Sequence, residues 1–181
     1  MSGGTDLRRK GEAPTGGRIA AFAPVAREDA RVLVLGSMPS VESLRRGFYY
    51  GHPRNAFWRI LADVFGAPLP CGIPEKTALL RENGIALWDV LASCAREGSL
   101  DSAIREPEPN DFAALFARCP GIERVLFNGA TAKSLFMRCA ARYLEGRAWA
   151  QMPSTSPAYT LSYERKLALW RRGLKDEHES L

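Results

Sequence analysis

The chain has 181 residues, of which 46% are hydrophobic and 25% charged, a composition typical of an ordinary soluble globular domain. No stretch approaches 18 consecutive apolar residues, and residues 1–17 lack the apolar segment of a secretory signal, so we expect no membrane partner. The four cysteines form no CxxC pair, which argues against a zinc site and predicts free thiols in a reducing cytoplasm. The net charge of +5 favours a polyanionic partner such as nucleic acid.

The length suits a single hydrophobic core, which we place at residues 19–175. Residues 1–18 are rich in glycine and poor in apolar side chains, so they are predicted to form a flexible tail. Residues 176–181 are predicted to form a polar tail. The sequence therefore predicts one domain between two tails.

Strands and helices are predicted to alternate along this domain. Residues 31–36 are a continuous apolar run that ends in glycine, which predicts a strand buried on both faces. Residues 55–65 have apolar positions at helical spacing, with Asn55 placed to cap the helix. The remaining predicted elements are a helix at 74–82, a strand at 85–88, a polar surface excursion at 96–110, a helix at 111–119, a strand at 124–127, a helix at 131–144, a strand at 148–152 and a helix at 162–174.

This alternation predicts a three-layer α/β/α sandwich around a central, mostly parallel four-stranded sheet. In such sheets ligands bind beyond the carboxyl ends of the strands. Each predicted strand ends in polar or turn-forming residues, namely Gly36–Ser40, Asp89, Asn128–Gly129 and Met152–Ser156. We therefore expect a small polar pocket at this edge.

Each of these endings alone also has a purely structural interpretation. Asn55 could be only a helix cap, Asp89 could cap a helix that follows it, and Ser154–Ser156 could be a plain turn as well as a phosphate cradle. Tyr49 and Tyr50 could stack on a base or cover the core. The sequence lacks the GxGxxG, GxxxxGK[ST], HExxH and GxSxG motifs, so we expect neither a metal nor a cofactor.

Three motifs are informative in combination: GSMPS at 36–40, YYGHPRNAFW at 49–58 and MPSTSP at 152–157. In this order they resemble the uracil-DNA glycosylase superfamily, and more narrowly its hypoxanthine-DNA (deoxyinosine) glycosylase branch. Residues 84–90, 98–103 and 127–129 extend the resemblance over about residues 31–165.

Two departures from the superfamily pattern bear on the chemistry. The first motif has no carboxylate or amide to position the attacking water, and the resemblance to the deoxyinosine branch implies that Asn55 takes this role. Met152 stands where many members have a histidine, so that imidazole cannot stabilise the departing base.

The resemblance implies further site residues. The base pocket would be formed by Gly36, Ser37, Met38, Tyr50, Asp89 and Asn128. DNA would be contacted by Ser40, Arg45, Arg46, Arg54, Ser154, Thr155, Ser156, Pro157, Ala158 and Tyr159, although the arginines could also be ordinary solvated side chains.

The expected activity is that of a monomeric, metal-independent enzyme of DNA repair, which hydrolyses the N-glycosidic bond of deaminated bases flipped out of DNA, hypoxanthine before uracil. Two alternatives stay open at this point. One is a catalytically weak or inactive nucleic-acid-binding protein of the same fold, and the other is a small-molecule hydrolase that acts on free nucleosides.

Overall fold

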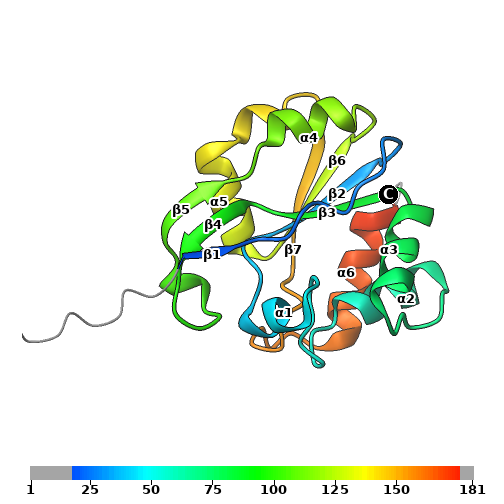
Figure 1. Ribbon diagram of the computed structural model, residues 1–181. Helices are drawn as coiled ribbons and strands as arrows, with labels where there is room; N and C mark the ends of the chain where they lie inside the picture. The colour runs from blue at the N-terminus through cyan, green and yellow to red at the C-terminus, as the bar shows by residue number, and fades with distance from the viewer. Residues whose placement is uncertain (1–17, 176–181) are drawn as a thin grey trace, which may run out of the picture.

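The computed structural model describes residues 18–175 (Figure 1). The tails predicted at 1–18 and 176–181 lie outside the described residues, except for Arg18, which begins a strand. Among residues 18–175, no helix combines the length and apolar character needed to cross a membrane.

A parallel four-stranded sheet forms the centre of the fold, as the sequence predicted. Its strands are β2 (Val32–Gly36), β3 (Ile85–Asp89), β6 (Arg124–Asn128) and β7 (Ala148–Met152), in the order β3-β2-β6-β7. The register pairs Gly36 with Asp89 and Asn128 with Met152, so all four strands end at one edge. That edge carries the polar residues singled out above.

Helices cover both faces of this sheet (Figure 1). On one face lie α4 (Phe112–Arg118) and α5 (Ala130–Cys139), and on the other α2 (Phe57–Phe65), α3 (Ile73–Glu82) and α6 (Tyr163–Lys175). Burial of the apolar β2 strand between these layers stabilises the fold through the hydrophobic effect. The predicted three-layer sandwich is confirmed, but the helix predicted at 131–144 is split, because α5 ends at Cys139 and a 3₁₀ turn follows at Ala141–Leu144.

A second, antiparallel sheet was not predicted. It consists of β1 (Arg18–Ala20), β4 (Leu91–Ala95) and β5 (Arg105–Pro109), in the order β1-β4-β5. The polar surface excursion predicted at 96–110 is exposed at 105–109, as expected, but those residues form a strand that the sequence did not indicate, and a 3₁₀ turn at Asp101–Ala103 precedes it. The β5 sequence REPEP is fully exposed and has no apolar alternation, so its pairing with β4, and not its own propensity, makes it a strand.

A short helix, α1 (Val41–Arg46), was also missed. The Ser43 amide donates to the Ser40 hydroxyl at its start (3.1 Å), and Gly47 ends it in the left-handed region at φ 72°. Residues 37–40 join the end of β2 to this helix, so the first motif lies between the sheet edge and α1.

Candidate base pocket and adjoining groove

A small pocket lies at the carboxyl edge of the sheet, where the four strand endings converge. Its volume is about 130 Å³. The residues that line it are Gly36, Ser37, Met38, Pro39, Ser40, Ser43, Tyr49, Tyr50, Asn55, Asp89, Ser99, Asp101, Asn128, Ser154, Thr155 and Ser156. All six residues predicted for the base pocket are therefore brought together, with Asn55 beside them.

Gly36 allows two polar groups to approach the end of β2. A Cβ atom at this position would lie 2.4 Å from Asp89 Oδ1 and 3.0 Å from the Tyr50 hydroxyl oxygen. Any larger residue would therefore displace the carboxyl group that faces the pocket.

Asp89 is the most unusual ionisable group of the pocket. Its side chain is only 3% exposed, and its Oδ2 atom has no hydrogen-bond partner among the described residues. Burial, reinforced by the negative charge of Asp101 and opposed by Arg96, raises the pKa of Asp89 to about 7. The chain continues from Asp89 into β4 and not into a helix, so the alternative interpretation of Asp89 as a helix cap is wrong.

Tyr49 and Tyr50, adjacent in sequence, have different roles. Tyr49 is buried, and its hydroxyl donates to the Ala23 carbonyl (2.9 Å), so it belongs to the core. Tyr50 lines the pocket with a backbone φ of 51°, which a non-glycine residue seldom adopts. Its hydroxyl is buried without a hydrogen-bond partner among the described residues, and burial next to Asp89 raises its pKa, so the phenol stays neutral.

Asn55 contacts the start of α2 and also lines the pocket. Its side-chain oxygen accepts a hydrogen bond from the Phe57 amide (3.0 Å) at the start of α2, as a cap would, and the residue also lines the pocket. An amide oxygen has two lone pairs, so this bond leaves one for a water molecule. The capping contact fixes the direction of that second lone pair.

Asn128 and Thr155 bind each other through two hydrogen bonds. The Asn128 Nδ2 donates to the Thr155 hydroxyl oxygen and the Thr155 amide donates to Asn128 Oδ1, both at 2.9 Å. The Thr155 carbonyl in turn accepts from the Ala56 amide (3.0 Å). Thr155 is 1% exposed, so this residue predicted to bind DNA instead joins β6 to the start of α2.

Residues of the segment that follows β4 hydrogen-bond to the first motif. The Ser37 hydroxyl donates to Asp101 Oδ1 (2.7 Å), and the buried Arg96 donates to the Pro39 carbonyl. Ser40 uses its hydroxyl to cap α1. These contacts fix the backbone of residues 36–40 around the pocket.

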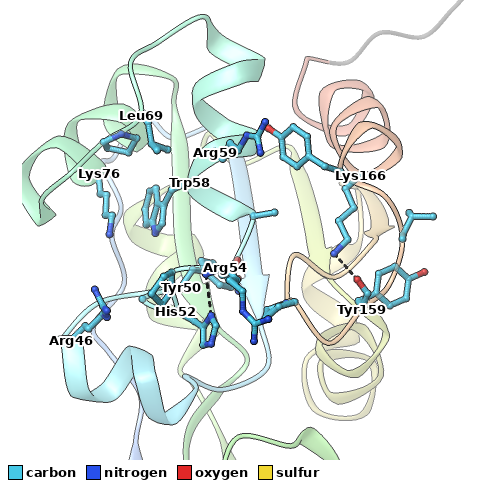
Figure 2. A pocket seen from close by; sticks show the side chains of 18 of the residues that line it. Arg46, Tyr50, His52, Arg54, Trp58, Arg59, Leu69, Lys76, Tyr159 and Lys166 are labelled. Atoms are coloured by element: carbon cyan, nitrogen blue, oxygen red, sulfur yellow. Dashed lines mark hydrogen bonds between the residues drawn. The ribbon is translucent and has the colours of Figure 1, made fainter.

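A larger hollow of about 610 Å³ adjoins the pocket (Figure 2). We call it the cationic groove, because five cationic side chains and no carboxylate line it. It shares Tyr50 and Asn55 with the pocket, and the residues that line it are Arg46, Tyr50, Gly51, His52, Pro53, Arg54, Asn55, Ala56, Trp58, Arg59, Leu69, Pro70, Lys76, Pro157, Tyr159, Thr160, Leu161, Tyr163 and Lys166.

The predicted DNA-contacting arginines occupy different places. Arg46 and Arg54 line the groove, whereas Arg45 does not. Both Arg45 and Arg46 donate to Glu42, which lies on the same helix, so one carboxylate offsets part of their charge. Pro157, Ala158 and Tyr159 are exposed on a loop beside the groove, while Ser154 and Ser156 line the pocket.

The sequence is similar to that of known DNA glycosylases. A sequence model of the uracil DNA glycosylase superfamily matches residues 23–176. The chain belongs to this superfamily. It is 41% identical over 109 residues to the hypoxanthine DNA glycosylase of Methanosarcina barkeri (60% of this chain, 69% of that protein) and 42% identical over 112 residues to that of Methanosarcina acetivorans (61% and 71%).

A solved structure of this superfamily agrees with the fold. The solution NMR structure of a candidate uracil DNA glycosylase from Methanosarcina acetivorans matches with a TM-score of 0.77 at 33% identity, over 88% of this chain and 98% of that one. The resemblance that the three motifs predicted is thus confirmed.

Several charged residues of the site were not predicted from the sequence, among them Arg59 and Lys166 in the groove wall. Asp101 lines the pocket from a loop whose sequence indicates only polar surface, and Arg96 supports the first motif from beneath. Lys76 lies on α3, outside all the motifs. The 98–103 motif could have drawn attention to Asp101, but no local signal distinguishes Arg96 or Lys76.

Proposed function

We propose that the protein is a DNA glycosylase that hydrolyses the N-glycosidic bond of deaminated bases, hypoxanthine before uracil, in nucleotides flipped out of DNA. One observation carries the proposal: a polar pocket at the sheet edge holds two buried polar atoms, unpartnered among the described residues, next to Asn55. Leaving such atoms without partners costs about 1–3 kcal/mol each, and a bound base could supply the partners. The names of the curated relatives support hypoxanthine as the base.

Asp89 would read the edge of the base in its protonated form. A neutral carboxyl group can donate to O6 of hypoxanthine while its other oxygen accepts from N1–H. The same pair of groups exists in uracil as N3–H and an adjacent carbonyl. As the glycosidic bond breaks, negative charge develops on the base, and a neutral carboxyl stabilises it where a carboxylate would repel it.

This role of Asp89 bears on the missing histidine of the MPSTSP motif. Met152 is buried and offers no donor to the departing base. A protonated Asp89 provides one from the opposite edge strand of the sheet, since β3 and β7 are its two outer strands. The backbone amides of residues 37–40 could add further donors.

Asn55 would hold the attacking water with the free lone pair of its amide oxygen. The sugar develops oxocarbenium character as the base leaves, so a weakly activated water suffices if it is well placed. Because Asn55 is fixed by the Phe57 amide and its neighbour Ala56 by Thr155, its position is defined on both sides.

The substrate would be DNA that contains a deaminated base, with Tyr50 stacking on that base and residues 157–159 inserted at the gap in the duplex. Action as a monomer and location in the cytoplasm stay predictions. An inactive DNA-binding protein of the same fold is not favoured, because the relatives are glycosylases by name and the residue predicted to be catalytic lines the pocket.

The test is release of free base from oligonucleotide duplexes that contain one deoxyinosine or one deoxyuridine. We expect release from both, faster from deoxyinosine, with an abasic site left in the strand. The matched duplex with deoxyadenosine serves as control. Release from neither substrate at any salt concentration would overturn the proposal, and release from free deoxyinosine alone would indicate a nucleoside hydrolase.

A further inference from the structure

The cationic groove contains charge that the chemistry of the base pocket does not use. Of its five cations, Lys166 is buried, and it donates to the carbonyls of Ser156 (3.2 Å) and Tyr159 (2.8 Å). Arg59 packs over the Tyr163 ring at 4.0 Å and lies 4.0 Å from Asp63. Both therefore hold the groove walls together.

The other three cations face the hollow. Within residues 18–175, neither Arg54 nor Lys76 has a carboxylate partner, and Arg46 shares its single carboxylate, Glu42, with Arg45. Lys76 reaches the groove from α3, and Arg46 reaches it from the end of α1, on the same side of the hollow (Figure 2).

Arg46 and Lys76 line the same side of the cationic groove (Figure 2). Burial, and secondly the charge of Arg46, lower the pKa of Lys76. The Lys76 ammonium lies 5.3 Å from the centre of the Trp58 ring, and the Trp58 indole N–H donates to the Tyr49 carbonyl (3.0 Å). A buried, fixed ring thus keeps the ammonium in place, and an anion between the two cations would relieve their repulsion.

We propose that Arg46 and Lys76 bind one backbone phosphate of the DNA strand that carries the flipped nucleotide, so that this strand leaves the base pocket along the cationic groove. The inference rests on the proposed function. It extends the DNA contact surface to α3, which lies outside all the motifs. It also assigns a phosphate contact to Arg46 and none to its neighbour Arg45, which does not line the groove.

The shape of the site supports a DNA strand as the occupant. The groove begins at Tyr50 and Asn55, which also line the base pocket, so a nucleotide bound there has its sugar at the groove's mouth. The groove has several times the volume of the base pocket, about 610 against 130 Å³, and no lining carboxylate would repel a phosphodiester.

The first measurement is the salt dependence of binding to a deoxyinosine duplex, with the full chain. Loss of one phosphate contact lowers the slope of log K against log[salt] by about 0.9. We expect this decrease in Lys76→Gln, near-normal slope in Lys76→Arg, and no change in Arg118→Gln, a matched loss of an exposed cation at the end of α4.

The second measurement locates the phosphate and distinguishes a backbone phosphodiester from a free phosphate ion. Single uncharged methylphosphonate linkages are placed in turn on either side of deoxyinosine, in the same strand. At one linkage we expect a penalty of about tenfold in Kd for the wild type that disappears in Lys76→Gln, as a double-mutant cycle requires for a direct contact. Inorganic phosphate alone should compete only at millimolar concentration.

The inference is overturned if no linkage couples to Lys76, or if Arg118→Gln changes the slope as much as Lys76→Gln does. Competition by micromolar inorganic phosphate would also overturn it, since the site would then be one for a free anion. Base release by the wild type, measured in the same samples, tests the proposed function separately, so the two can fail independently.

Discussion

The base pocket and the cationic groove share a wall but differ in charge and in the state of their polar groups. The pocket contains Asp89 and Asp101, with no cation among its lining residues, whereas the groove contains five cations and no carboxylate. We expect a protonated Asp89 to suit the pocket to a neutral base, and the five cations to suit the groove to a polyanion. Within the site, the cationic side chains therefore line the groove and not the pocket.

The difference separates chemistry from affinity. Changes in the pocket should alter base release or its pH dependence and leave the salt slope of DNA binding unchanged. Changes in the groove should do the reverse. Asn55 lines both the pocket and the groove, so its substitution tests most directly whether base release and DNA affinity can be changed separately.

Asn55→Ala should lower base release by about 100- to 1,000-fold, because the water loses its anchor, while DNA affinity changes little. Loss of the cap should also cost about 1 kcal/mol of stability. Single-turnover release and Kd are to be measured in parallel.

Asp111→Ala is the matched control for Asn55→Ala. It removes the cap of α4, where Asp111 accepts from the Ala114 amide (3.0 Å), and leaves the pocket untouched. Equal loss of activity in the two variants would show that Asn55 acts only through helix stability.

Asp89→Asn should stabilise the protein at neutral and alkaline pH. Because the folded-state pKa is raised to about 7, folding takes up a proton between about pH 4 and pH 7, and the free energy of unfolding of the wild type falls as pH rises across this window. The asparagine side chain carries no charge, so we expect the variant to gain about 2 to 4 kcal/mol over the wild type at pH 8 and little at pH 4. Denaturant melts at both pH values measure this.

The same variant tests the role of Asp89 in catalysis. An amide resembles the protonated carboxyl in having a donor group on one side and an acceptor oxygen on the other. Asp89→Asn should therefore keep base release and lose the decline that we expect for the wild type above about pH 7. A wild-type rate that rises through pH 7 would instead mean that the carboxylate is the active form.

Gly36→Ala should destabilise the protein by about 1–3 kcal/mol and impair base release. The added methyl would lie 2.4 Å from Asp89 Oδ1, so the carboxyl must move or the strand must shift. Thermal melts and base release check this, and Gly72→Ala, where φ is −113° and no atom lies closer than 3.5 Å to the added methyl, controls for the loss of a glycine. An unchanged rate in Gly36→Ala would show that the position of Asp89 does not matter.

Thr155→Val should have the smallest effect, about 1 kcal/mol, because only the hydroxyl that accepts from Asn128 is lost. Its carbonyl still accepts from the Ala56 amide, so base release should fall less than in Gly36→Ala. A loss as large as that of Asn55→Ala would mean that the hydroxyl itself contacts the substrate.

The sequence predicted the central sheet and the pocket because both follow from local signals. The buried runs at 32–36, 85–89 and 124–128 are apolar enough to identify as strands, and parallel strands must bring their ends to one edge. β5 could not be predicted in this way, because its residues are all exposed and show no alternation of apolar and polar side chains.

Roles that depend on long-range packing were beyond the sequence. In sequence, Arg96 resembles an ordinary surface arginine, but the pairing of β4 with β1 and β5 buries it under the first motif. Lys76 joins the groove only because α3 packs beside α2, and Arg45 is excluded from it only by the direction in which α1 turns. None of these relations is encoded within a short stretch of chain.

The hydrogen bonds around Thr155 set a limit for anyone who wishes to retarget this protein. Thr155 is hydrogen-bonded to Asn128 at the end of β6 and to the Ala56 amide at the start of α2. A one-residue insertion before Thr155 would therefore displace Ala56 and, with it, the neighbouring Asn55. The stretch 157–160 is exposed, and Lys166 holds it through the Tyr159 carbonyl and a contact with the Tyr159 ring, away from Asn55 and Asp89. Libraries aimed at new sequence contexts belong in those four positions, where side chains can vary while the hydrolytic geometry is inherited intact.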